Sequence, residues 1–165
     1  MIANAKDAGG AASAAWSMRR AGPGPSKVTE LLLIIGGSVF GVLGLLHAVY
    51  TFADARRPRR LAPDDPAVVE AMRSSGLRLS RGGTTIWRAW LGFNFSHSLG
   101  VLLFSFGCVT LGLFARAVAL PKSVLLLPVG VGSIYLWLAI RYWFRIPAVG
   151  IALATLCFVA AWIAY

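Results

Sequence analysis

Four long stretches of the sequence contain no charged side chain, and they limit the possible folds more than any other feature. They cover residues 31–53, 89–115, 123–140 and 146–165, and are 23, 27, 18 and 20 residues long. A helix needs about 20 residues to cross the hydrocarbon core of a bilayer. Because lipid offers the backbone no hydrogen-bond partner, only helices and closed barrels span it, and continuous apolar runs favour helices. We therefore predict an all-α fold, an integral membrane four-helix bundle.

The composition agrees with a membrane protein and marks one segment as different. Hydrophobic residues make up 58% of the chain and the mean hydropathy is +0.72, whereas soluble domains are about 45–50% apolar. Residues 1–27 are instead rich in Ala and Gly and contain Pro23 and Pro25. We expect this segment to be a disordered tail. Residues 28–165 then form one domain, in which a basic loop at 54–88 joins the first two spans.

The arginines of that loop dominate the net charge of +10. Eight loop arginines, with Arg141 and Arg145, place ten positive charges on one side of the bundle, against six on the other. The positive-inside rule then predicts a cytoplasmic loop and both termini on the opposite side. No nucleic-acid recognition motif accompanies the charge, so we predict no nucleic-acid partner. The sequence RRPRR instead makes four residues candidates for contact with anionic membrane lipids: Arg56, Arg57, Arg59 and Arg60.

Other residues are expected at the membrane surface. Within the loop, Asp65 as a cap, Pro66 in the first turn and Gly76 as a terminator predict a short helix. Aromatic rings at the ends of the spans are typical of headgroup level. These rings belong to Trp87, Trp90, Tyr142, Trp143, Trp162 and Tyr165.

Polar side chains inside the spans coincide in depth. At about 1.5 Å per residue, His47 lies about 10 Å from the cytoplasmic end of the first span and His97 about 13 Å from that of the second. The same count puts Tyr135 at about 9 Å and Thr155 at about 13 Å. Asn94 precedes His97 by three residues and shares its helix face. We therefore predict a polar layer across all four helices.

The layer has three possible roles. Because polar groups in a membrane usually face the bundle interior and pair, it can be a scaffold that holds the helices in register. It can also be the site of a small molecule, lipid or quinone, with four candidate ligand-binding residues: His47, Asn94, His97 and Tyr135. In the third reading, His47 and His97 bind a haem b or a redox metal in a membrane-embedded enzyme.

Several absences constrain the chemistry. Zinc normally needs three or four ligands, and only Asp54 comes near the level of the two histidines, so we predict no metal site. The sequence contains no nucleophile elbow, no phosphate-binding glycine loop and no H-E-x-x-H motif. Whether the protein is an enzyme stays open at this point.

Small residues recur on the first two spans. Gly37 and Gly41 form a GxxxG motif on the first span, extended by Gly44, and Gly92, Ser96 and Gly100 repeat every four residues on the second. Such seams allow close approach of helix backbones. We expect both seams to join helices within one chain, with an oligomer as the alternative.

Three stretches carry a resemblance: GLLHAVYTFAD at 44–54, RRPRRLAPDDPAVVEAM at 56–72 and TIWRAWLGFNFSHSLG at 85–100. They resemble an uncharacterised family of small bacterial four-span membrane proteins. The resemblance covers about residues 30–145. It implies the four-helix fold and a location in the inner membrane, and it implies no activity.

Overall fold

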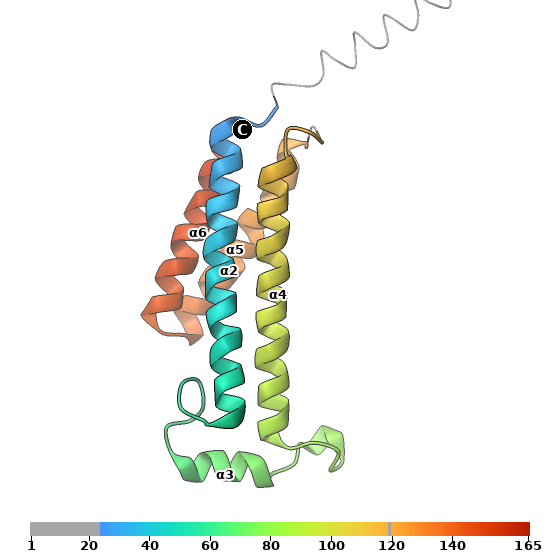
Figure 1. Ribbon diagram of the computed structural model, residues 1–165, viewed down its shortest axis with the longest axis vertical. Helices are drawn as coiled ribbons and strands as arrows, with labels where there is room; N and C mark the ends of the chain where they lie inside the picture. Colours follow the sequence, from blue (N-terminus) through green and yellow to red (C-terminus); the bar gives the residue numbers. More distant parts are fainter. Residues whose placement is uncertain (1–23, 119) are drawn as a thin grey trace, which may run out of the picture.

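The computed structural model describes residues 24–118 and 120–165, and within them four helices are long and apolar enough to cross a membrane (Figure 1). These helices are α2 (Lys27–Arg56), α4 (Ile86–Phe114), α5 (Leu126–Tyr142, preceded by the 3-10 turn η2, Lys122–Leu125) and α6 (Arg145–Ile163). The short helix α3 (Pro66–Ser74) and the 3-10 turn η1 (Arg78–Ser80) lie in the loop between α2 and α4. The all-α four-helix bundle is confirmed, and the protein is a multi-pass membrane protein.

The helices begin and end near capping residues, and not at the boundaries of the uncharged stretches. α2 begins four residues before Leu31, because the side chain of Ser26 accepts a hydrogen bond from the backbone N–H of Thr29. Asp65 caps α3 as expected, but the helix ends at Ser74 and not at Gly76. Of the predicted tail at 1–27, residues 1–23 lie outside the described residues.

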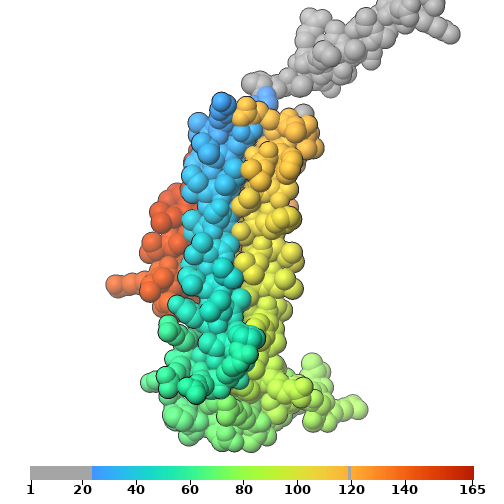
Figure 2. Space-filling model, viewed as in Figure 1, coloured from blue at the N-terminus to red at the C-terminus, as the bar shows by residue number. Residues whose placement is uncertain are grey.

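α2 is the central helix of the bundle. It packs against α4 on one side and α6 on another, while α5 packs mainly against α6. Figure 1 shows α2 and α4 running side by side for most of their length, and Figure 2 shows their side chains meeting along this face.

Glycines make the contact between α2 and α4 close. A Cβ added to Gly37 would lie 2.9 Å from the Cβ of Cys108, and one added to Gly41 would lie 2.6 Å from the Oγ of Ser105. The hydroxyl of Ser105 also donates a hydrogen bond of 2.7 Å to the carbonyl of Gly37. The first glycine seam therefore joins two helices of one chain, as predicted.

The second seam faces the other way. Gly92, Ser96 and Gly100 are all exposed, and a Cβ added to either glycine would meet no atom within 4 Å. The expectation that this seam joins helices within the chain was wrong, because α4 turns its opposite face toward α2.

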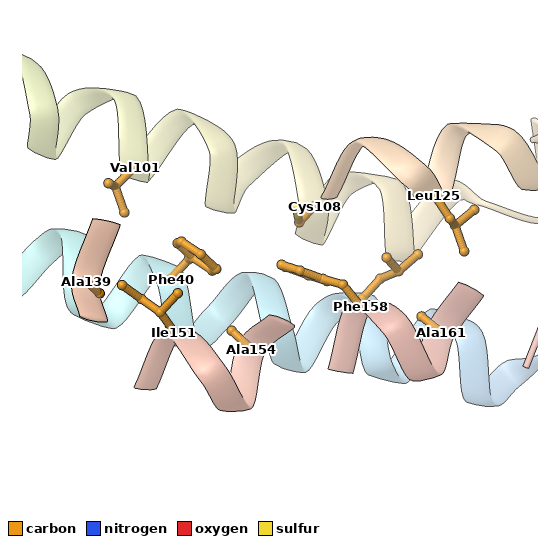
Figure 3. Close-up of a cluster of buried hydrophobic side chains, with 10 residues drawn as sticks. Phe40, Val101, Cys108, Leu125, Ala139, Ile151, Ala154, Phe158 and Ala161 are labelled. Atoms are coloured by element: carbon orange, nitrogen blue, oxygen red, sulfur yellow. The ribbon is translucent and has the colours of Figure 1, made fainter. Parts of the chain in front are cut away.

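Large apolar side chains fill the space between the helices (Figure 3). Phe40 from α2 and Phe158 from α6 are the largest of the fully buried side chains. Phe40 packs edge-on against Phe104 of α4 and Tyr135 of α5, with ring centroids 5.0 and 5.6 Å apart. This aromatic cluster ties all four helices together.

The helices are level at one end of the bundle and unequal at the other. Ser26 donates a hydrogen bond to the carbonyl of Ala164, and Glu30 forms an ion pair with Arg116 just after α4. From this common end, α2 and α4 run for 30 and 29 residues, but α5 and α6 for only 17 and 19. α2 and α4 therefore continue past the turn between α5 and α6 (Figure 1). The resulting step in the bundle is where the polar residues gather.

Candidate functional site

The structure brings the four candidate residues together. The Nε2 atom of His47 lies 2.9 Å from the Oδ1 atom of Asn94, so α2 and α4 share a hydrogen bond. The rings of His47 and His97 have centroids 5.2 Å apart, and the rings of His97 and Tyr135 have centroids 5.8 Å apart. Counting depth along antiparallel helices therefore placed His47 and His97 at one level correctly, and the ring of Tyr135 lies against His97.

The hydrogen bond between His47 and Asn94 has a defined direction. The Nδ2 atom of Asn94 donates to the carbonyl of Trp90 at 2.8 Å, so its Oδ1 atom is the acceptor for His47. The Nε2 atom of His47 is then the donor, and in a neutral imidazole Nδ1 remains an acceptor. Asn94 is buried and does not line the cavity described below. Its role is to orient His47.

Trp143 completes the cluster, although we expected it only at headgroup level. Its ring stacks on His97, with centroids 6.3 Å apart and planes 18° apart, and packs edge-on against His47 at 5.3 Å. Trp143 lies in the turn between α5 and α6, which stops at the level of the histidines. The shorter third stretch of uncharged residues was the only sequence signal that this turn lies deeper than the end of α2.

These side chains surround a cavity of about 460 Å³, within the range of about 300–1,000 Å³ that is usual for ligand pockets. Phe40, Val101 and Ile151 line its inner part, and Tyr50 and Leu61 line it near the loop that follows α2. The lining residues with polar atoms in their side chains are His47, His97, Tyr135, Tyr50, Tyr142 and Trp143. The site is therefore an apolar cavity with a small polar region.

Most polar side chains of the cavity wall have no hydrogen-bond partner among residues 24–118 and 120–165: those of His97, Tyr135, Tyr50, Tyr142 and Trp143. His97 and Tyr135 are partly buried, and their rings lie next to each other, with centroids 5.8 Å apart. His47, in contrast, is held by Asn94. In surroundings this apolar, a polar group without a partner is costly unless water or a ligand supplies one.

Two other residues do not join the polar layer. The hydroxyl of Thr155 donates to the carbonyl of Ile151, and Thr155 packs against Gly132. The carboxylate of Asp54 accepts hydrogen bonds from backbone N–H groups of residues 59–62. The layer thus draws its members from α2, α4 and α5, and Asp54 is not available to a metal beside the histidines.

The geometry of the two imidazoles does not suit a haem between them. Two axial ligands must face each other across the porphyrin plane, whereas these rings are in edge contact at an interplanar angle of 70°. The Nε2 atom of His47 is also engaged by Asn94. Within the described residues, no three His, Cys, Asp or Glu side chains gather at one point.

No family model, no curated protein and no solved structure matches this chain. The resemblance to small bacterial four-span membrane proteins therefore stays a prediction.

Proposed function

We propose that the protein binds a small amphipathic molecule in the cavity between α2, α4, α5, α6 and the α5–α6 turn. The observation that carries the proposal is a pair of adjacent polar side chains, His97 and Tyr135, on a wall that is otherwise largely apolar; neither has a hydrogen-bond partner among the described residues. The apolar part of the ligand would contact Phe40, Val101 and Ile151.

The polar groups define which ligand chemistry fits. A tyrosine hydroxyl donates and accepts hydrogen bonds, and a neutral imidazole does the same through its two nitrogens. A carbonyl, ester or hydroxyl group of the ligand can therefore pair with His97 and Tyr135 together. Stacking on Trp143 holds the His97 ring in place. Lipids and quinones both meet this requirement.

The proposal includes the predicted location. We place the protein in the inner membrane with the arginine-rich loop in the cytoplasm. The positive-inside rule supports this orientation, because it puts the side with ten basic residues in the cytoplasm and the side with six on the opposite face. The cavity then opens near the cytoplasmic headgroups. Labelling of single cysteines in the loop by a membrane-impermeant maleimide, in intact and in opened cells, tests this orientation.

To test binding, the protein is transferred from its native membrane into nanodiscs and purified. Compounds bound to it are then extracted with organic solvent and identified by mass spectrometry. We expect one amphipathic compound at about one molecule per protein, and its loss in the variants His97→Leu and Tyr135→Phe. Ser96→Ala is the control, because Ser96 is a polar residue on the outer face of the same helix. Each variant must elute from size-exclusion chromatography as the native protein does.

A scaffold role gives a different result. If the polar residues serve only to hold the helices together, His97→Leu changes the unfolding midpoint while the extracted compounds stay the same. Retention of the compound by His97→Leu, or the absence of any stoichiometric compound, would contradict the proposed function.

A further inference from the structure

The loop that follows α2 is built around the Asp54 carboxylate. Backbone N–H groups of Arg59, Arg60, Leu61 and Ala62 donate to its two oxygens at 2.6–3.2 Å. Asp54 is fully buried by this arrangement. The loop is therefore a defined structure, held through its backbone and not through its arginine side chains.

Because the Asp54 carboxylate is bound by the backbone, the arginine side chains around it form no ion pair with it. Arg56, Arg57, Arg59 and Arg60 are all exposed and line one hollow around Asp54. Within residues 24–118 and 120–165, the ion pairs are Arg73 with Glu70 and Arg116 with Glu30. The carboxylate nearest the hollow already accepts its hydrogen bonds from the backbone. The hollow thus presents four arginines that form no ion pair within the described residues, and their charge exceeds that of the single Asp54 carboxylate among them.

Arg60 connects this hollow to the cavity. Its guanidinium lies over the ring of Tyr50, 5.0 Å from the centroid, and Tyr50 lines the cavity. The next residue, Leu61, lines the cavity as well. One turn of α2 separates Tyr50 from His47, so the positive charge lies just outside the polar region of the cavity.

We propose that the ligand is an anionic single-chain lipid, with its charged head at Arg60 and its chain in the cavity. The inference depends on the proposed function and specifies its ligand class. Arginine favours phosphate and carboxylate because its donors match their oxygens. An ester or hydroxyl group next to the head would reach His97 and Tyr135. The volume of about 460 Å³ lies toward the low end of ligand pockets and suits one chain better than two.

The test measures binding of radiolabelled oleoyl lysophosphatidic acid to the full chain in phosphatidylcholine nanodiscs, by scintillation proximity. Oleoyl lysophosphatidylcholine, which has the same chain and a zwitterionic head, and inorganic phosphate serve as competitors. The variant is Arg60→Gln, which leaves the backbone hydrogen bonds to Asp54 in place. The control is Arg78→Gln, because Arg78 is an exposed arginine of the same loop that lies outside the hollow.

We expect Arg60→Gln to raise the Kd for lysophosphatidic acid about tenfold or more, as loss of a charge-assisted hydrogen bond would. Arg78→Gln should change it by less than about twofold, since exposed charges at a distance are screened. Lysophosphatidylcholine should compete weakly and inorganic phosphate hardly at all.

Other outcomes separate this inference from the proposed function. Suppose that both lipids bind with the same Kd, that Arg60→Gln leaves this Kd unchanged and that His97→Leu raises it. The cavity then binds amphipathic molecules, but not through an anionic head. If inorganic phosphate competes as well as the lipid, the arginines form an anion site unconnected with the cavity, and the inference is wrong. If neither lipid responds to His97→Leu, both the inference and the proposed function fail.

Discussion

Substitution of Gly112 by alanine tests the packing that creates the bundle. A Cβ at this position on α4 would lie 2.9 Å from the backbone carbonyl oxygen of Glu30 and 3.2 Å from the backbone nitrogen of Ile34, both on α2. Comfortable contacts between heavy atoms are about 3.5–4.0 Å, so the two helices must separate by roughly 0.5 Å locally. Because backbone atoms cannot rotate away, we expect the free energy of unfolding to fall by about 1–3 kcal/mol.

Gly107→Ala is the matched control on the same helix. Gly107 is exposed, and a Cβ added there meets no atom within 4 Å. Both substitutions gain the helix propensity of alanine over glycine, up to about 1 kcal/mol, so this gain largely cancels in the comparison. Titration with SDS, followed by tryptophan fluorescence, measures both variants. Equal stability of the two, within about 0.5 kcal/mol, would refute the described contact between α2 and α4.

Two further predictions concern polar contacts. Asn94→Leu should lower the free energy of unfolding by about 1 kcal/mol, because the N–H of His47 loses its partner; the SDS titration used for Gly112 measures this, and an unchanged midpoint would mean that the hydrogen bond contributes nothing. Asp54→Ala should speed amide hydrogen exchange of residues 59–62 by about tenfold or more, since their N–H groups lose their acceptor. In the control Asp65→Ala, where one N–H group of α3 loses its cap, exchange at 59–62 should stay as in the native protein; slow exchange in Asp54→Ala would show that something else holds the loop.

The positions of the spans and the depth of the polar residues could be predicted because both are properties of the chain taken one segment at a time. Length and absence of charge identify a membrane helix, and a fixed rise per residue converts sequence distance into depth. His47 and His97 were placed at one level by this count, and the ring of Tyr135 reaches His97 from farther along the shorter helix α5. Thr155 was assigned to the same level in error, since the count assumes that all four helices end together at the cytoplasmic side.

The orientation of each helix about its axis was not predictable in the same way. In a soluble bundle an apolar stripe marks the buried face, but in lipid both faces of a helix are apolar. The sequence therefore showed two small-residue seams, at Gly37 and at Gly92, without showing that only the first faces another helix. The contact of Trp143 with both histidines was missed for another reason, because the early turn between α5 and α6 was not predicted.

What the sequence by itself determined is an all-α protein with four membrane-spanning helices, one basic loop and a set of polar residues at similar depth. Only the tertiary structure decided that α5 and α6 turn back early, that a cavity forms at this step, and that Asp54 uses its carboxylate on the loop backbone. These features depend on contacts between segments far apart in the chain. Local hydropathy and spacing carry no information about such contacts, because many arrangements of four apolar helices bury the same residues equally well.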